Sequence, residues 1–268
     1  MKEIKAILFD LDDTLLVEKN SAKESFIETI CSIDFKADKE EFVGVIKEEA
    51  RKLWYEMPVN DYCLKIGISS WEGLWADFDG DNDNLRYLKA HALEYRRNTW
   101  INALSRYGIA SSLLAEELGE KFKAIRNTKH NVSPDALSCL EQLKPYAALG
   151  LITNGAPDIQ QKKIKGSGLS HFFKSIVISG EYGVAKPDAS IFNEVLRQLR
   201  YPAAHALMVG DTLKTDIQGA VNAGIRSVWV NRNNKETDTG KLKPDYEIND
   251  LSMLCKWFFP SNSGTVRY

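Results

Sequence analysis

The sequence has no long apolar run, few cysteines and no strong excess of charge of one sign. Its longest apolar stretches, such as SIVIS and ALMVG, are far too short to span a bilayer. The four cysteines lie far apart and form no CxxC pair, which argues against a disulfide framework or a zinc site. The formal net charge is -2, and Lys and Arg are spread among acidic residues, which argues against nucleic acid as a partner.

The rest of the composition is that of an ordinary globular protein. Hydrophobic residues make up 44% and charged residues 27% of 268 residues, enough for one large domain or for a core domain with a smaller insertion. Asp10 interrupts the N-terminal stretch MKEIKAILFD before any signal core can form, so we expect a cytoplasmic protein with no membrane partner. The C-terminal stretch PSNSGTVRY is expected to be mobile.

Two regions of the chain differ in pattern. From about residue 17 to 130, apolar residues recur every three or four positions, which is typical of helices. The tryptophans of this region are predicted to form its core rather than a ligand site; they are Trp54, Trp71, Trp75 and Trp100. After about residue 135, short β-rich runs alternate with helices, and the N-terminal KAILFDLD matches them. A helix is predicted to begin at Pro134, with Ser133 as its N-cap.

The alternation predicts an α/β fold in which a parallel sheet is flanked by helices. Residues 1–16 and 131–268 are predicted to form this core, and residues 17–130 an inserted helical domain. Ligands bind at the carboxyl ends of strands in such sheets. The residues that follow the predicted strands are Asp10 and Asp12, then Thr153, Asn154 and Gly155, then Lys186, and finally Asp211 with Asp216.

The four motifs FDLDDTL, ITNG, AKPD and GDTLKTD, in this order, resemble those of phosphatases of the haloacid dehalogenase superfamily. The resemblance implies a Rossmann-like core and places the helical insertion where the family has its cap. The later core segment looks like the subgroup with acylneuraminate phosphate phosphatases, pyrimidine nucleotidases and phosphoserine phosphatase-like proteins. It implies a phosphatase that uses Mg²⁺ and hydrolyses a small phosphorylated metabolite.

The chemistry of phosphate esters and the resemblance together assign roles to the acidic residues. Asp10 is the predicted nucleophile and forms an aspartyl phosphate, while Asp12 is the predicted general acid and base. Carboxylates this close together need a cation between them and a dianionic substrate. The predicted Mg²⁺ ligands are the side chains of Asp10 and Asp211, the side chain of Asp216 either directly or through a water molecule, and the main-chain carbonyl of Asp12 as the family implies. Asp13 is predicted to shape the turn.

The remaining motif residues are predicted to bind the substrate. Lys186 would neutralise the nucleophile and a phosphate oxygen, as a catalytic and substrate-binding residue. Thr153 would hold the transferring phosphoryl group, and Asn154 would orient its loop or touch the phosphate. Gly155 belongs to the same loop, which opens a helix whose N-terminus attracts anions. Glu181 is a candidate for a supporting contact behind the site.

Three other functions remain open at this point. A haloacid dehalogenase shares the nucleophilic Asp, but its chemistry needs neither a metal nor a proton donor at the position of Asp12. A phosphomutase would pass the phosphoryl group to a sugar hydroxyl instead of water. A regulatory module that is no enzyme could hold a phosphoryl group on Asp10 as a signal, although it needs neither Asp12 nor a large helical insertion.

Overall fold

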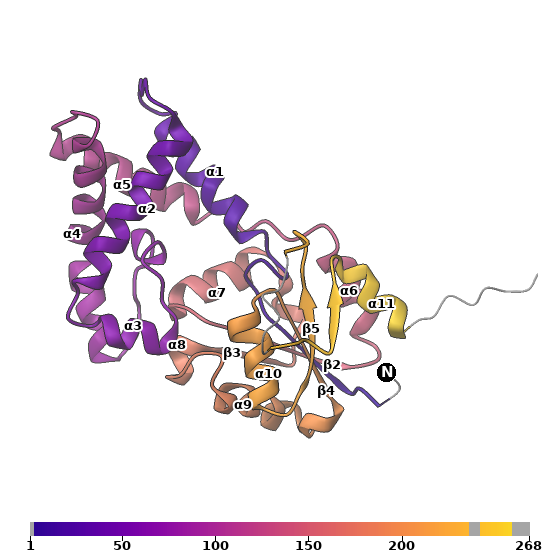
Figure 1. The fold of residues 1–268 in the computed structure, drawn as a ribbon. Coiled ribbons are helices and arrows are strands. Elements are labelled where there is room, and N and C mark those ends of the chain that lie inside the picture. Colours follow the sequence, from indigo (N-terminus) through magenta and orange to yellow (C-terminus); the bar gives the residue numbers. More distant parts are fainter. Residues whose placement is uncertain (1–2, 236–241, 259–268) are drawn as a thin grey trace, which may run out of the picture.

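The protein is described here by a computed structural model that covers residues 3–235 and 242–258. Within these ranges, six parallel strands form one sheet in the order β3-β2-β1-β4-β5-β6 (Figure 1). The strands are β1 (Ala6–Phe9), β2 (Ala148–Thr153), β3 (Ser175–Ile178), β4 (Ala206–Gly210), β5 (Arg226–Val230) and β6 (Tyr246–Ile248). The N-terminal strand therefore belongs to the sheet, as predicted, and lies in its middle. The predicted mobility of residues 260–268 falls outside the described ranges.

The strands are apolar on both faces because helices cover both sides of the sheet. Ile7 and Phe9 point into the same apolar cluster as α6 and α11, while Ala6 and Leu8 point into a second cluster with α9 and α10. The helices of this part of the chain are α6 (Ala136–Leu143), α7 (Pro157–Gly166), α8 (Ser179–Tyr182), α9 (Ala189–Leu199), α10 (Gln218–Asn222) and α11 (Leu251–Phe258). This arrangement confirms the predicted α/β core with a parallel sheet.

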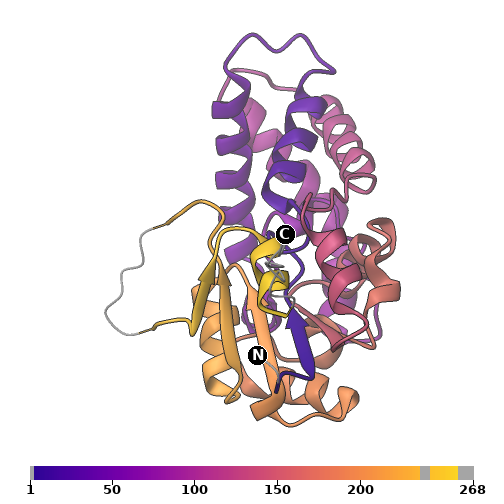
Figure 2. The ribbon, with the colours of Figure 1, turned by 90° about the vertical axis from the view of Figure 1, so that its right-hand side faces the viewer.

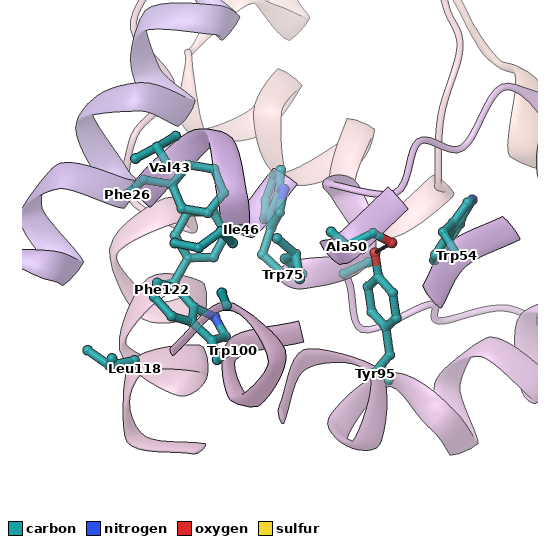
Figure 3. Packing of buried hydrophobic residues seen from close by; sticks show 14 of the residues in the cluster. Phe26, Val43, Ile46, Ala50, Trp54, Trp75, Tyr95, Trp100, Leu118 and Phe122 are labelled. Atoms are coloured by element: carbon teal, nitrogen blue, oxygen red, sulfur yellow. Dashed lines mark hydrogen bonds between the residues drawn. The ribbon is translucent and has the colours of Figure 1, made fainter. Parts of the chain in front are cut away.

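The segment between β1 and α6 is helical and lies at one end of the sheet (Figures 1 and 2). Its helices are α1 (Glu18–Ile30), α2 (Lys39–Tyr55), α3 (Asn60–Ile66), α4 (Asp83–Ser105) and α5 (Ser112–Arg126). They enclose one apolar cluster that contains Trp54, Trp75 and Trp100 (Figure 3), and Trp71 is half-buried. The prediction that these tryptophans serve the core is therefore confirmed for the three buried ones.

The helical segment leaves and rejoins the rest of the chain at one place. The Val17 N–H donates to the Asn131 carbonyl at 2.9 Å, and Leu16 pairs with Val132 as an isolated antiparallel bridge. The same segment also packs on the end of the sheet, since Ile159 of α7 belongs to the apolar cluster of the helices. Within residues 3–235 and 242–258, every helix is too short or too polar to serve as a bilayer span.

The sequence analysis misplaces or misses three local features of the structure. Helix α6 begins at Ala136 instead of Pro134, and its N-cap is Asp135 rather than Ser133, whose hydroxyl donates to Asp135 Oδ1 at 2.8 Å. Strand β3 ends at Ile178, and the following residues SGEY form α8 instead of extending the strand. Strand β6 and helix α11 were not predicted, because β6 has three residues and two of them are exposed.

Candidate active site

Asp10 stands at the carboxyl end of the central strand β1. Its N–H donates to the Val209 carbonyl at 3.0 Å, which continues the pairing of β1 with β4 by one residue. The chain then turns tightly, since the N–H groups of Leu15 and Leu16 both donate to the Leu11 carbonyl at 2.9 Å. Asp10 is 6% exposed. A hydrogen bond of the sheet and a closed turn therefore hold a buried carboxylate at the edge of the core.

Asp13 shapes this turn, as predicted. Its φ of 61° lies in the left-handed region, which Asp tolerates better than most residues. Its carboxylate accepts the Lys19 N–H at 3.0 Å and contacts the Lys19 ammonium at 2.7 Å. One free N–H of the first turn of α1 is thereby satisfied. Asp13 therefore joins the strand end to the helical segment.

Three carboxylates and one ammonium meet at the end of the sheet. Carboxylate oxygens of Asp10, Asp211 and Asp216 all lie within 4.8 Å of one another. The Lys186 ammonium, 4% exposed, donates to Asp10 Oδ1, to Asp216 Oδ1 at 2.7 Å and to the Ile152 carbonyl at 3.1 Å. Residues from three different strand ends thus form one buried charged group with more negative than positive charge.

The electrostatics of this group favour an added cation. Burial raises the pKa of Asp10 well above its usual value, and the Asp216 and Asp211 carboxylates add to this against the opposing Lys186 ammonium. Burial, with the neighbouring Asp216 carboxylate, also raises the pKa of Asp211 to about 6. Burial alone would lower the pKa of Lys186, but Asp10 and Asp216 outweigh it and raise the pKa. One buried ammonium, Lys186, and the exposed Lys19 at 3.8 Å from Asp211 face the three carboxylates, and a divalent cation would stabilise their ionised forms.

Asn154 fixes the loop that carries Lys186. Its Oδ1 accepts the Lys186 N–H at 2.9 Å, and its Nδ2 donates to the Lys186 carbonyl at 3.1 Å. Thr153 is buried, and its hydroxyl donates to Gln160 Oε1 at 3.0 Å. The Gly155 N–H donates to the Ser179 hydroxyl at 2.9 Å. In this structure the side chains of Thr153 and Asn154 and the N–H of Gly155 therefore make contacts that build the site.

A cavity of about 250 Å³ opens over this group of charges. Its lining brings together most of the residues that the motifs predicted, together with Lys19; they are Asp10, Asp12, Asp13, Lys19, Thr153, Asn154, Lys186, Asp211, Thr212, Thr215 and Asp216. Glu181 is not among its lining residues and instead accepts a hydrogen bond from Gln161 at an exposed position of α8. Residues of all four motifs therefore contribute to the lining of one cavity.

Asp12 lies two residues beyond Asp10 but in a different environment. Its Oδ2 accepts a hydrogen bond from the Lys163 ammonium at 2.8 Å and a longer one from Gln160 Nε2 at 3.4 Å. Its Oδ1 is buried and has no hydrogen-bond partner within the described residues. Burial raises the pKa of Asp12, although Lys163 opposes the rise. Asp10 and Asp12 of the first motif thus have different partners: Asp10 pairs with Lys186 and Asp12 with Lys163.

Sequence reasoning missed the charged residues behind Asp12. Gln160 and Lys163 lie on α7, about one and two turns beyond its start, and both are fully buried. Lys163 also contacts Glu18 Oε1 at 3.1 Å, and Glu18 receives two hydrogen bonds from Arg126. Gln160 donates to Glu72 Oε1 at 3.1 Å. Lys163 follows Ile159 by four positions on a buried helix stripe, and this spacing was the one signal for its burial.

Glu72 supplies a prediction for the pH dependence of stability. Burial raises its pKa from 4.5 to about 7, although Lys163 opposes the rise. The folded state therefore keeps a proton that the unfolded state loses between pH 4.5 and 7, so stability falls by about 3 kcal/mol as pH rises through this window. We expect Glu72→Gln to remove this slope. Urea unfolding at pH 5 and pH 8 measures it.

The control for this experiment is Glu141→Gln, which changes an exposed carboxylate on α6. It should follow the wild-type dependence on pH. The amide of Glu72→Gln cannot accept from both Ser69 and Gln160 as the carboxylate does, so some stability is lost at every pH. The test therefore compares the change in the free energy of unfolding between pH 5 and pH 8, not its value at either pH. An equal change in the free energy of unfolding with pH for Glu72→Gln and wild type would show that Glu72 is ionised in the folded protein at both pH values.

A sequence model of one enzyme family matches residues 4–224, a span that holds all four motifs and the site built above. That family is described as haloacid dehalogenase-like hydrolase. The chain belongs to the haloacid dehalogenase-like hydrolases. The family predicted from the motifs is therefore confirmed, and the chain is an enzyme rather than a module that only carries a phosphoryl group.

Relatives within this hydrolase family include named phosphatases. The chain is 35% identical over 249 residues to the phosphoserine phosphatase of Thermus thermophilus, covering 92% of this chain and 96% of the relative. It is 28% identical over 258 residues to the N-acylneuraminate-9-phosphatase of Mus musculus, covering 95% and 93%. Among solved structures, the putative HAD-hydrolase YfnB of Bacillus subtilis matches with a TM-score of 0.64 at 25% identity, covering 94% and 96%. The match of fold extends over both the sheet and the helical segment.

Proposed function

We propose that this phosphatase hydrolyses the phosphate monoester of a small metabolite through an aspartyl phosphate on Asp10. The observation that carries the proposal is the difference in environment between two carboxylates of one motif, Asp10 and Asp12. Asp10 is buried against Lys186 beside two further carboxylates, while Asp12 lines the same cavity and keeps its Oδ1 without a hydrogen-bond partner among the described residues. One carboxylate is placed to attack and the other to move protons.

Mg²⁺ fits the acidic group as its cation. The donors are carboxylate oxygens, which Mg²⁺ prefers, and they lie within 4.8 Å of one another on Asp10, Asp211 and Asp216. The main-chain carbonyl of Asp12 is the proposed fourth protein ligand. YfnB, which shares the fold, is described as bound to magnesium. When bound, the cation neutralises negative charge between the nucleophile and the phosphate dianion.

The chain's own residues then divide the reaction into two steps. Asp10 Oδ attacks phosphorus, the bond to the ester oxygen breaks, and Asp12 Oδ1 gives that oxygen a proton. In the second step Asp12 takes a proton from a water molecule, whose oxygen attacks the aspartyl phosphate and releases phosphate and free Asp10. Lys186 holds Asp10 and a phosphate oxygen, and the loop of Thr153, Asn154 and Gly155 binds the phosphoryl group.

The helical segment is proposed to be a cap domain of residues 17–130, set on a core of residues 1–16 and 131–268. The hydrogen bond between Val17 and Asn131 supports both boundaries, because the chain enters the helical segment at residue 17 and leaves it near residue 131, and these two places are in contact. The cap packs on the site end of the sheet, where the Ala185 N–H donates to the Lys65 carbonyl at 3.1 Å. It would exclude water from the site and select the leaving group.

Removal of Mg²⁺ tests the proposal. We expect p-nitrophenyl phosphate turnover to fall by at least about 100-fold in EDTA and to return with excess Mg²⁺, since the cation contributes several kcal/mol of charge stabilisation. A panel of phosphoserine, glycerol 3-phosphate, ribose 5-phosphate, N-acetylneuraminate 9-phosphate and uridine 5′-monophosphate, ranked by kcat/KM, would identify the substrate class. Turnover that EDTA leaves unchanged would contradict the proposal.

The same assay separates the two rival enzymes. A dehalogenase would release halide from 2-chloropropionate in EDTA and would not release phosphate from any member of the panel. A phosphomutase would convert a sugar phosphate to its isomer without free phosphate. Only release of inorganic phosphate that depends on Mg²⁺ agrees with the proposed hydrolysis.

A further inference from the structure

A buried cluster of charged side chains lies directly behind Asp12. Lys163 is at its centre, fully buried, 2.8 Å from Asp12 Oδ2 and 3.1 Å from Glu18 Oε1. Arg126, also fully buried, holds the other side of Glu18 through two hydrogen bonds. The proposed reaction uses Asp12 but assigns nothing to Lys163, Glu18 or Arg126. Charges are rarely buried in this number without a role in holding something in place.

The members of the cluster come from different parts of the chain. Lys163 lies on α7 beside the sheet, whereas Glu18 is the first residue of α1 and Arg126 the last residue of α5. The helical segment therefore contributes residues from both of its ends. Glu72, from the turn Glu72–Leu74 in the middle of that segment, adds a third contact through Gln160 at 3.1 Å.

Two tryptophans close the cluster from the side of the helical segment. The Trp75 ring lies 4.4 Å from the Arg126 guanidinium and 5.8 Å from the Lys163 ammonium, measured to the ring centroid. The Trp71 centroid lies 5.6 Å from the same ammonium. These rings attract the cations and keep water away from them. In a dry surrounding, the Lys163 ammonium depends on Asp12 and Glu18 for its hydrogen bonds, and it cannot turn away without leaving both unpaired.

The two oxygens of Asp12 are therefore not equivalent. Oδ2 is held by Lys163 and, more loosely, by Gln160. Oδ1 is buried without a partner among the described residues, and Asp12 lines the cavity over Asp10. A salt bridge that served stability alone would have no need to leave one carboxylate oxygen unpaired at the site. The contact from Lys163 instead fixes the direction in which the free oxygen points.

We propose that Lys163 is the positioning residue of Asp12, and that Glu18 with Arg126 ties it to the two ends of the helical segment. The inference rests on the proposed function, since it assumes that Asp12 transfers protons. Lys163 holds Oδ2 so that Oδ1 faces the ester oxygen of the substrate. Because Glu18 and Arg126 anchor Lys163, Asp12 is aimed correctly only when the ends of α1 and α5 lie against α7.

The test compares Lys163→Met with Lys162→Met. Lys162 directly precedes Lys163 on α7, is half-buried and pairs with Asp77, so it is a matched control that leaves Asp12 untouched. Both are assayed with Mg²⁺ against p-nitrophenyl phosphate and against the alkyl ester of the panel with the highest kcat/KM. The nitrophenolate leaves without a proton, whereas an alkoxide needs one. The parameter kcat/KM reports the step in which the leaving group departs.

We expect Lys163→Met to lower kcat/KM about 100-fold for the alkyl ester and less than about threefold for p-nitrophenyl phosphate, as loss of an aligned general acid predicts. Lys162→Met should change the ratio of the two values by less than about twofold, since it leaves the general acid aligned. A purely structural role would lower both substrates by the same factor. An equal fall, or no fall, in Lys163→Met overturns the inference.

Two further variants keep the outcome clear. Asp12→Asn must show the same preference for the nitrophenyl ester. If Asp12→Asn lacks this preference, the proposed function is wrong. If Asp12→Asn shows the preference and Lys163→Met lacks it, only the inference is wrong. If Lys163→Met fails to fold, Glu18→Gln replaces it. That change keeps an acceptor for Arg126 but weakens the anchor of Lys163, and we expect about a tenfold selective loss for the alkyl ester, smaller than full loss of the general acid. An unchanged ratio in Glu18→Gln would then count against the inference.

Discussion

Asp10→Asn is expected to lower kcat/KM for every phosphate monoester by about 10⁴-fold or more, as removal of a nucleophile does in other enzymes. The amide cannot form an acyl phosphate, and no other described carboxylate is placed to replace it. Asp211 and Asp216 share the site, but Asp216 is engaged on both oxygens by Lys186 and the Thr212 N–H. Steady-state rates with p-nitrophenyl phosphate and saturating Mg²⁺ measure the loss.

The variant should remain folded, which keeps the result interpretable. The amide occupies the same volume, and Lys186 retains Asp216 at 2.7 Å and the Ile152 carbonyl at 3.1 Å. Asp13→Asn is the matched control, because it also neutralises one carboxylate of the first motif yet can still accept the Lys19 N–H. It should retain activity within about tenfold, since it removes no reacting group. Turnover by Asp10→Asn within tenfold of wild type would exclude Asp10 as the nucleophile.

The sequence allowed prediction of the residues that follow strands. Asp10, Lys186 and Asp211 are far apart in the chain, yet the carboxyl ends of parallel strands meet at one edge of a sheet, so their order along the chain was enough to bring them together. The helical character of residues 17–130 was equally predictable from the spacing of apolar residues. In both cases a local pattern determines a feature of the whole fold.

Residues on helices were harder to assign. A lysine in the sequence PDIQQKKIKG suggests a solvated face, and apart from its spacing of four from Ile159 nothing local distinguishes the buried Lys163 from the half-buried Lys162. The partners of Lys163 are 151 and 145 positions away along the chain, counted to Asp12 and to Glu18. Such pairs depend on how the helical segment sits on the sheet, and a single sequence contains no signal for that placement.

Lys186→Met is expected to destabilise the protein by about 3 kcal/mol at pH 8, as removal of one partner from a buried ion pair does. The ammonium contacts Asp10 and Asp216, and without it these two buried carboxylates would lie together with no cation between them, while Asp211 would keep only the exposed Lys19 ammonium at 3.8 Å. Activity should fall by about 10³-fold as well, because the phosphate would lose a fixed positive charge. Unfolding in urea and steady-state kinetics measure the two effects, with the exposed Lys214→Met as control.

The pH dependence of this variant tests the cause of the loss. Lys186 is charged in both the folded and the unfolded states from pH 5 to 8, because its pKa is raised above an already high usual value, so its own titration adds no slope. Burial already raises the pKa of Asp10, and loss of the ammonium raises it further. The folded variant should therefore keep a proton that the unfolded chain releases. Its loss of unfolding free energy relative to wild type should then become smaller as the pH is lowered from 8 to 5. Added Mg²⁺ should also recover part of the stability at pH 8, since it replaces the missing positive charge. A deficit that is independent of both pH and Mg²⁺ would mean that Lys186 contributes packing rather than charge.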